Sequence, residues 1–394
     1  MNNFPKVHLH AKKDRAVRLF HPWIFSGAIQ NVEGNPAEGD IVEIYSQENE
    51  YLATGHFHEG SIKVRIFSFS KTDCSENFWI EKFKKAYENR KRIGLVDNAS
   101  TNVYRLIHAE GDGLPGLIID IYDTVAVIQT HTIGMHNQKA NFVNALKEIY
   151  GSKLEAIFDK SSETMSKQSA KTIENGFLFG HLEETIITEN DIKFYVNWVE
   201  GQKTGFFIDQ RENRKLLLNY SKNKKVLNTF SYSGAFSMYS LVGGATEVHS
   251  VDSSKRAVEL AVRNAELNNH SSNHQFFKED AFDFLKKSEE LYDIVILDPP
   301  AFAKHLSSVD KAMIGYRNLN TDGIKRVAPG GLLFTFSCSQ VIDKTLFRKV
   351  VFQAAAQSKR NVRILYQLSQ GPDHAISLYH PEGEYLKGLV LQID

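Results

Sequence analysis

The chain has 394 residues, of which 42% are hydrophobic and 24% are charged, and it has 47 Lys plus Arg against 47 Asp plus Glu. These values are typical of globular proteins and exclude a mostly disordered chain. Because the formal net charge is zero, any basic surface for a nucleic acid must be local. The length exceeds the size at which single cores stop growing, so we expect two or three domains.

The chain contains only two cysteines, Cys74 and Cys338, which lack the paired spacing of a zinc site or a disulfide framework. We therefore expect no bound metal. The first residues show no charged-then-apolar secretory pattern, and no run of about 18 apolar residues occurs. These features favour a cytoplasmic protein without a membrane partner.

Residues 1–72 contain short alternating runs, such as IVEIY before Ser46 and IKVRIF after Ser61, separated by Gly, Asn and Pro. This pattern predicts a small all-β domain.

The next segment predicts an amphipathic helix. In residues 78–93, a helical spacing is followed by Trp79, Phe83, Ala86, Tyr87 and Ile93. The turn EGDGLPG between apolar runs predicts a hairpin over 103–122. We assign residues 73–184 to a middle α+β domain.

From residue 225 onward, apolar strands alternate with helical stretches, which is typical of a doubly wound, mostly parallel sheet in an α/β domain. We assign this third domain to residues 185–394. The candidate strands are 225–230, 247–252, 274–277, 293–298 and 332–337, with weaker ones at 362–366 and 388–393.

The residues that follow these strands point to a nucleoside ligand, because ligands of such sheets bind beyond the carboxyl ends of the strands. After the first strand comes FSYSGAFS with one glycine, Gly234, where a dinucleotide site has three, so a ligand without a pyrophosphate is expected. Asp252 ends the second strand, where a carboxylate typically binds a ribose. Asp280 and Ala281 follow the third strand and are suited to adenine. Adenosine without phosphates predicts S-adenosylmethionine.

Each of these acids alone is more often a helix N-cap, but carboxylates at three successive strand ends, Asp298 included, favour the ligand site. The predicted cofactor contacts are Gln210, Asn228, Phe230, Ser231, Ser233, Gly234, Asp252, Asp280, Ala281 and Asp298.

The fourth strand leads into LDPPAF, where Pro299 and Pro300 stiffen the loop and direct Asp298 toward a flat ligand. Phe302 either stacks on an extruded base or packs within its loop.

Cys338 follows the fifth strand at the same edge. A lone cysteine is usually a small buried hydrophobe, but this position favours a nucleophile. Carbon 5 of a pyrimidine reacts with a methyl donor once a thiolate has added to carbon 6. We predict that Cys338 and Asp298 are catalytic.

Two segments carry a local excess of positive charge that suits RNA phosphates, although a solvated face is an equally good explanation of each. The first twenty residues hold five basic residues against one acid, and residues 203–225 hold seven against two. Trp23 lies beside the first cluster, where it either stacks on a base or belongs to the core. The predicted substrate contacts are Lys12, Arg15, Lys203, Arg211, Pro299 and Phe302.

Several segments resemble the RlmI-type family of large-subunit ribosomal RNA cytosine-5 methyltransferases over nearly the whole chain. They are HPWIFSGAI, EGDGLPGL, GQKTGFFIDQREN, FSYSGAFS, LDPPAF, FTFSCS and HPEGEYLKG. The resemblance implies an N-terminal PUA domain for RNA, a middle β-α-β domain and a class I methyltransferase domain. It also implies Cys338 as nucleophile, Asp252 and Asp280 as cofactor acids and Asp298 as the acid that contacts the base. Related enzymes with two cysteines have a second one after a DPP-like loop, where this chain has Ala301, so the removal of hydrogen 5 is unassigned.

Three alternatives stay open. DPPAF is similar to the DPPY-type loops of enzymes that methylate a base nitrogen, which need no thiol, although Ala301 separates the prolines from Phe302 here. A non-catalytic RNA-binding or ribosome-assembly protein would not need Asp252, Asp298 and Cys338 together. An NAD-linked enzyme is disfavoured by the missing glycines. The expected partner is large-subunit rRNA, and a homodimer is a further alternative.

Overall fold

The computed structural model describes residues 4–165 and 173–394 and divides into two compact units. Unit 1 comprises Met1–Thr185, Val196–Phe206 and Pro372–Gly383, and unit 2 comprises Ile186–Tyr195, Phe207–Gly371 and Glu384–Asp394. The first two predicted domains therefore lie in one unit, together with two short segments from the region of the predicted third domain.

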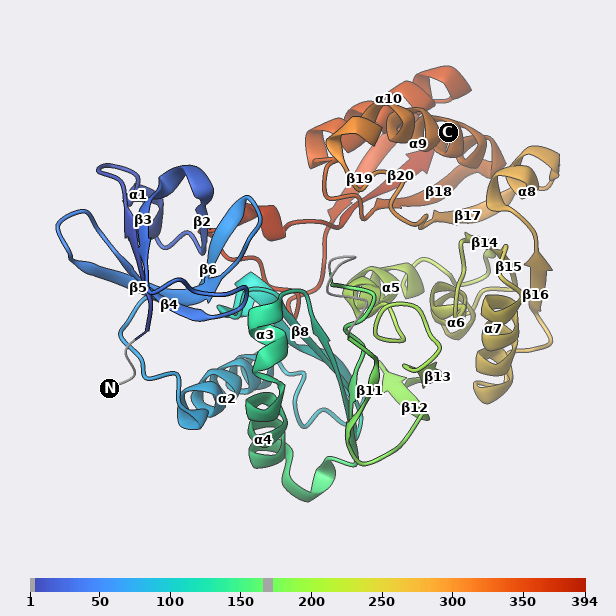
Figure 1. Ribbon diagram of the computed structural model, residues 1–394. Coiled ribbons are helices and arrows are strands. Elements are labelled where there is room, and N and C mark those ends of the chain that lie inside the picture. Colours follow the sequence, from blue (N-terminus) through green and yellow to red (C-terminus); the bar gives the residue numbers. More distant parts are fainter. Residues whose placement is uncertain (1–3, 166–172) are drawn as a thin grey trace. The chain divides into compact units, whose positions relative to one another are not determined.

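Unit 1 begins with a six-stranded sheet in the order β2-β6-β5-β4-β1-β3 (Figure 1). Its strands are β1 (Lys6–Leu9), β2 (Trp23–Phe25), β3 (Ile29–Glu33), β4 (Ile41–Tyr45), β5 (Tyr51–Phe57) and β6 (Ile62–Ser68). Val42 and Ile44 are buried, as the alternation in IVEIY predicts. The expectation of an all-β domain is wrong in one detail, because the short helix α1 (Arg15–Arg18) buries Val17 in the same core.

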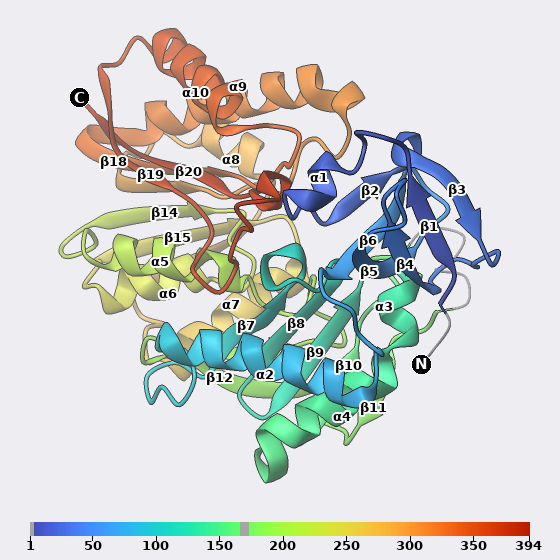
Figure 2. The same cartoon turned by 90° about the vertical axis from the view of Figure 1, so that its left-hand side faces the viewer.

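The second sheet of unit 1 has the order β11-β10-β9-β8-β7. The strands are β7 (Val103–His108), β8 (Leu117–Tyr122), β9 (Val125–Thr130), β10 (Ala156–Asp159) and β11 (Gly176–Phe179). The hairpin prediction is confirmed, since β7 and β8 pair antiparallel on either side of the EGDGLPG turn. Figure 2 shows α2 (Glu76–Arg92) and α4 (Lys139–Tyr150) side by side along this sheet, and α3 (Ile133–Asn137) precedes α4. The helix prediction holds for Trp79 and Phe83, which are buried, whereas Ile93 is the exposed C-cap residue of α2.

Unit 2 is built on a seven-stranded sheet in the order β16-β15-β14-β17-β18-β20-β19. The strands are β14 (Lys225–Thr229), β15 (Glu247–Asp252), β16 (His274–Lys278), β17 (Tyr292–Leu297), β18 (Val327–Ser337), β19 (Val362–Leu368) and β20 (Lys387–Ile393). All seven strand predictions are confirmed. β20 is antiparallel to both of its neighbours and the other neighbouring strands are parallel. The pair β12 (Glu184–Glu189) and β13 (Ile192–Asn197) precedes this sheet in the chain.

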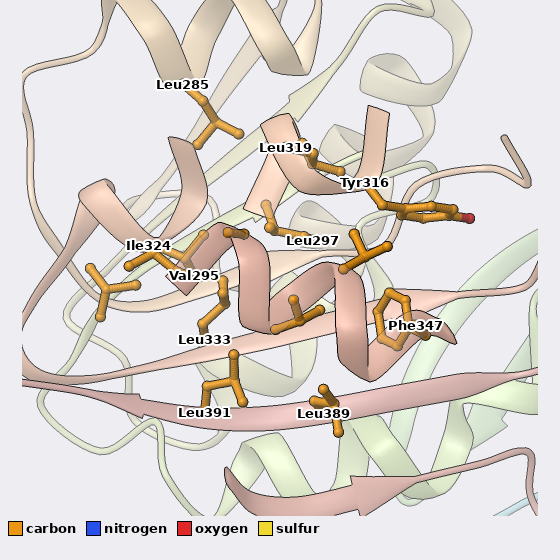
Figure 3. Close-up of a cluster of buried hydrophobic side chains, with 14 of the residues drawn as sticks. Leu285, Val295, Leu297, Tyr316, Leu319, Ile324, Leu333, Phe347, Leu389 and Leu391 are labelled. Carbon is orange, nitrogen blue, oxygen red and sulfur yellow. The ribbon is translucent and has the colours of Figure 1, made fainter. Parts of the chain in front are cut away.

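Helices cover both faces of the sheet, so successive residues of the central strands β14, β15 and β17 are buried instead of alternating between buried and exposed. In Figure 1, α5 (Arg211–Leu218), α6 (Ala235–Val242) and α7 (Lys255–Leu267) lie on one side. On the other side lie α8 (Ala281–Lys287), α9 (Val309–Arg326) and α10 (Lys344–Ser358). Figure 3 shows the core on this second side, where Leu297 and Leu333 of the sheet pack against Leu319 and Phe347 of the helices.

The strand register brings the functional segments to one edge of this sheet. Thr229 of β14 pairs with both Val251 of β15 and Leu297 of β17, and Leu297 pairs with Thr335 of β18. Because these four strands are parallel, the residues that follow their carboxyl ends converge. The loop after β14, Asp252, Asp298 and Cys338 all lie at this edge.

Candidate active site

The loop after β14 has an unusual backbone. Phe230, Tyr232 and Gly234 have positive φ angles of 55°, 45° and 73°. For the two aromatic residues such angles are strained and are typical of functional loops. Glycine is needed at position 234, because a Cβ there would lie 3.0 Å from Cβ of Ala261. The alternating angles fold the loop tightly against the next strand, where the Ser231 amide donates to the carbonyl oxygen of Val251 at 3.1 Å.

Asp252 fixes this loop. Its Oδ2 accepts a hydrogen bond from the amide of Tyr232 at 2.9 Å, and its Oδ1 accepts one from the amide of Ser254 at 2.9 Å. A carboxylate has about four acceptor positions, so about two of them are left for a ligand. Asp252 therefore shapes the loop and still has acceptors for a ligand.

The other predicted cofactor residues of this loop differ in what they offer a ligand. The Ser231 hydroxyl is buried and has no hydrogen-bond partner among the described residues, which fits a polar ligand that supplies one. Asn228 is buried and donates through Nδ2 to Oγ of Ser237 at 2.9 Å. The carbonyl oxygen of Ser233 accepts from Nδ2 of Asn264 at 2.8 Å. Asn228 thus ties β14 to α6, and Ser233 ties the loop to α7.

Asp280 is the N-cap residue of α8. Its Oδ1 accepts hydrogen bonds from the amides of Phe282 at 2.9 Å and Asp283 at 3.1 Å. The side chain is exposed, and Ala281 is the buried first residue of the helix. The helix-cap explanation of this acid therefore holds in the structure, and an adenine contact stays a prediction for its remaining acceptors.

Asp298 lies directly after β17 and is hydrogen-bonded to a residue of the GQKTGFFIDQREN segment. Nε2 of Gln210 donates to Oδ1 of Asp298 at 3.0 Å. Oε1 of Gln210 accepts from Nδ2 of Asn213 at 2.6 Å, which orients the Gln210 amide. Removal from water, together with the negative charge of Asp209, raises the pKa of Asp298 to about 7. At neutral pH this carboxyl group can both donate and accept a proton.

Cys338 lies directly after β18, beside the LDPPAF loop. Its Sγ is 3.9 Å from the carbonyl oxygen of Pro299. Burial raises the pKa of the Cys338 thiol to about 12, and the charges of Asp298 and Asp209 act in the same direction. The thiol is therefore protonated at neutral pH, and it must lose its proton to a nearby group before it can act as a nucleophile.

A buried lysine stands beside this cysteine. Nζ of Lys387 donates to the carbonyl oxygens of Ser339 at 2.7 Å and Tyr385 at 2.6 Å. Burial lowers the pKa of Lys387 to about 8, and its positive charge opposes the rise in the pKa of Cys338. Lys387 thus supplies a positive charge where a thiolate would form.

The two loops that carry Asp298 and Cys338 are joined by a hydrogen-bonded serine. Oγ of Ser339 accepts from the amide of Ala303 at 3.3 Å and shares a hydrogen bond with the Tyr316 hydroxyl at 3.0 Å. The ring of Phe302 packs against that of Tyr316 at 4.5 Å between centroids. Phe302 therefore packs within its loop in this structure, and its stacking on a base stays a prediction.

The two basic segments have different outcomes. Lys12 and Arg15 are exposed in unit 1, as a phosphate-binding surface requires. In the segment 203–225, both the phosphate-contact prediction and the solvated-face alternative require exposed basic side chains, and not all of them are exposed. Lys203 is exposed but belongs to unit 1, whereas Arg211 and Arg214 are buried in unit 2. Arg214 is buried in an ion pair, since it contacts both carboxylate oxygens of Glu189 at 2.8 Å.

Trp23 is only partly buried, and its polar atom is engaged within unit 1. Its Nε1 donates to Oε1 of Glu110 at 2.9 Å, the guanidinium of Arg65 lies over its ring at 4.8 Å, and the ring of His380 is 4.3 Å away. These contacts are those of a packed side chain and not of a free stacking surface.

The sequence interpretation missed three residues of the site, Asp209, Tyr385 and Lys387. Each lies inside a segment that the resemblance singled out, GQKTGFFIDQREN or HPEGEYLKG. A signal was thus present, but neither segment follows a parallel strand, where the candidate ligand-binding residues were expected. The Tyr385 hydroxyl donates to Oδ2 of Asp209 at 2.7 Å and joins the two segments.

No group of three or more His, Cys, Asp or Glu residues within 4–165 and 173–394 is arranged to hold a metal ion. In the same ranges, no helix is long and apolar enough to cross a membrane.

Comparisons with known proteins agree with this architecture. A family profile described as a PUA-like domain matches residues 7–69, and one described as an S-adenosylmethionine-dependent methyltransferase matches residues 168–375. Ribosomal RNA large subunit methyltransferase I of Aeromonas hydrophila is 39% identical to the chain, with 98% of each protein covered. The protein of that name from Pseudoalteromonas atlantica is 38% identical, over 98% of this chain and 99% of that one.

A solved structure complexed with S-adenosylhomocysteine superimposes with a TM-score of 0.85 at 24% identity, over 98% of this chain and 99% of that one. This likeness shows a shared fold. The strand order of unit 2, with its antiparallel β20, is that of a class I methyltransferase domain. The chain therefore belongs to the family of ribosomal RNA large subunit methyltransferase I and is an S-adenosylmethionine-dependent methyltransferase with a PUA-like domain.

Proposed function

We propose that the protein methylates carbon 5 of a cytosine in large-subunit ribosomal RNA, through a covalent bond between Cys338 and carbon 6 of the base. The observation that carries this proposal is the position of the Cys338 thiol at the strand end beside Asp298, 3.9 Å from the carbonyl oxygen of Pro299. The RNA substrate is supported by the names of the relatives and by the PUA-like domain.

The residues around the loop after β14 fit S-adenosylmethionine. Asp252 has acceptors left for ribose hydroxyls, and the buried Ser231 hydroxyl lacks a partner that a polar ligand would supply. The tight loop at Gly234 leaves no glycine-rich cradle for a pyrophosphate. When bound here, the cofactor supplies the methyl group that carbon 5 receives.

The residues of this chain divide the proton transfers between them. The Asp298 carboxylate accepts the proton of the Cys338 thiol, and Lys387 stabilises the resulting negative charge. As the thiolate adds to carbon 6, the protonated Asp298 donates to ring nitrogen 3, which leaves carbon 5 electron-rich. A carboxyl group with a pKa of about 7 is suited to both transfers, because a proton shuttle works best near the ambient pH.

Methylation of a base nitrogen is the second candidate, and the LDPPAF loop favours it. A nitrogen already carries a lone pair, so such a reaction needs Asp298 and the stiff prolines but no thiol. The role of Cys338 therefore separates the two candidates.

We expect Cys338→Ala to abolish methyl transfer to rRNA while S-adenosylmethionine affinity stays within about twofold, because the thiol is directed to the base and not to the cofactor. The measurements are radiolabelled methyl transfer and calorimetry. RNA with 5-fluorocytosine at the target should form an adduct with the unmutated enzyme that survives denaturing electrophoresis, since fluorine cannot leave as a proton. Cys74→Ala is the control and should behave like wild type. Substantial activity in Cys338→Ala, with no adduct, would transfer the proposal to nitrogen methylation.

Three further expectations from the sequence stay predictions. They are the division into domains at residues 1–72, 73–184 and 185–394, a cytoplasmic location and a homodimer. RNA contact by Lys12 and Arg15 is supported by their exposure in unit 1, where the rings of Phe20 and Phe25 are exposed as well.

A further inference from the structure

The proposed reaction lacks one group, the base that removes hydrogen 5 after methyl transfer. Ala301 occupies the position where related two-cysteine enzymes have a second thiol, and Cys74, the other cysteine of the chain, belongs to unit 1. Asp298 already has another role in the proposed mechanism, since it exchanges its proton with ring nitrogen 3. The base must therefore be another group at the carboxyl edge of the sheet.

Asp209 is a carboxylate that the mechanism has not used. Its Oδ2 accepts a hydrogen bond from the Tyr385 hydroxyl at 2.7 Å. Its Oδ1 is buried and has no hydrogen-bond partner among the described residues. A buried carboxylate oxygen without a donor is unfavourable by itself, and such an atom in a native structure has an explanation such as a catalytic role, a bound water or ion, or local strain.

The position of Asp209 relative to the reacting groups is fixed through its neighbours. The adjacent Gln210 donates to Asp298 at 3.0 Å, and Tyr385 lies two residues from Lys387 in the chain. The negative charge of Asp209 contributes to the raised pKa of both Asp298 and Cys338, so it lies within electrostatic range of both. Asp209 thus lies near Asp298 and Cys338, on a different segment of unit 2.

We propose that Asp209 is the base that removes the hydrogen from carbon 5 of the covalent intermediate. This inference rests on the proposed cytosine-5 reaction. After methyl transfer, carbon 5 is saturated and carries both hydrogen and methyl, and the ring bears a positive charge. The free Oδ1 of Asp209 takes the proton, and the electrons of the C5–H bond restore the double bond between carbons 5 and 6. The bond between carbon 6 and Sγ breaks, the thiolate leaves, and nitrogen 3 returns its proton to Asp298.

The other nearby groups are less suited to this step. Lys387 donates to two carbonyl oxygens, and a protonated ammonium group has no lone pair. Gln210 is not basic. An anionic carboxylate also stabilises the positive charge of the methylated ring, which favours Asp209 before the proton moves.

The test uses the full-length enzyme with rRNA from cells that lack the gene, labelled with tritium at carbon 5 of cytosine, and with carbon-labelled S-adenosylmethionine. In wild type, each methyl group transferred should release one tritium into water. In Asp209→Asn, tritium release should fall at least a hundredfold, while an enzyme–RNA adduct that carries both labels accumulates. The adduct distinguishes a blocked elimination from a general loss of activity.

Asp310→Asn is the matched control, because it removes one negative charge from an exposed position on α9 and should not alter tritium release. Asp209→Glu should recover part of the release. Tyr385→Phe, which keeps the carboxylate but removes its hydrogen bond, should slow release without abolishing it. These two variants keep the test decisive if Asp209→Asn does not fold.

Normal tritium release by Asp209→Asn overturns the proposal. So does an Asp209→Asn variant that binds S-adenosylmethionine at least tenfold more weakly and forms no adduct, since Asp209 would then hold the cofactor. Failure of the underlying function has a separate signature, because wild type would then form no adduct with 5-fluorocytosine RNA and would release no tritium.

Discussion

The carboxylate of Asp252 has two roles that a substitution can separate. It accepts hydrogen bonds from the backbone amides of Tyr232 and Ser254, and it has acceptor positions left for a ribose. We expect Asp252→Ala to weaken S-adenosylmethionine binding by about 1.5–3 kcal/mol, the usual range for a hydrogen bond to a charged group. Calorimetry measures this loss. Asp252→Asn, which keeps one oxygen acceptor, should lose less, and equal losses in the two variants would assign the effect to charge alone.

Asp298 makes the stability of the protein depend on pH. Its pKa is raised from an ordinary value of 3.8 to about 7, so the folded state binds this proton more tightly than the unfolded state does. The resulting stabilisation is fully present below about pH 4 and is lost as the pH rises through about 7.

Asp298→Asn should remove this loss. The unfolding free energy of the variant minus that of wild type should therefore increase by up to about 3 kcal/mol from pH 5 to pH 8. The size follows because one pKa unit corresponds to about 1.4 kcal/mol. Urea denaturation at both pH values measures the difference. Asp310→Asn is the exposed control, and a difference that does not change with pH would contradict the raised pKa of Asp298.

At the scale of elements, a buried ion pair joins β12 to α5. Arg214 binds Glu189 through two nitrogens at 2.8 Å, both side chains are almost fully buried, and the Tyr239 hydroxyl also donates to Glu189 at 3.0 Å. Arg214→Met would leave an uncompensated buried carboxylate. We expect it to destabilise the protein by about 3–5 kcal/mol in chemical denaturation.

Combining Arg214→Met with Glu189→Gln should recover part of this loss, because the buried charge is then gone. Lys255 and Glu259 form an exposed pair at 3.3 Å and provide the control. Lys255→Met should change stability by less than about 1 kcal/mol. A small effect of Arg214→Met would mean that water reaches Glu189.

At the scale of the molecule, deletion of the first predicted domain is an unsuitable test of RNA binding. Phe67 of β6 packs in the same core cluster as Trp79 and Phe83 of α2, so a deletion of residues 1–72 would open the core of unit 1. Surface substitutions avoid this damage.

If Lys12 and Arg15 contact phosphates, the logarithm of RNA affinity should fall by about 0.7 per log unit of salt for each contact on single strands. Replacing both residues by Ala should reduce the slope by about 1.4. Fluorescence anisotropy over a salt series measures it, with Lys349→Ala as an exposed control in unit 2. An unchanged slope would exclude this surface from the RNA contacts.

Local sequence patterns predicted the strands of the sheet in unit 2 and, in unit 1, the helix α2 and the hairpin of β7 and β8. A run of apolar residues such as VILD or LLFTFS stops at a polar residue, and the seven candidate strands of the third domain are all present. The first error concerns α1, because a four-residue helix has too few positions to show a helical period. The second concerns Arg211 and Arg214, because a charge count along the chain cannot tell a solvated cation from one buried beside a carboxylate.

The sequence by itself determined the fold class and the cofactor, because strand ends at one edge of a parallel sheet place Gly234, Asp252, Asp298 and Cys338 in order along the chain. The family followed from the resemblance of the quoted segments. The tertiary structure alone brought Asp209 and Lys387 to that edge. Asp209 lies in a 3₁₀ helix, Ile208–Gln210, before α5, and Lys387 begins the antiparallel β20. Neither position follows a parallel strand. The raised pKa of Asp298 and of Cys338 also depends on burial and on charges distant in the chain, which only the folded arrangement creates.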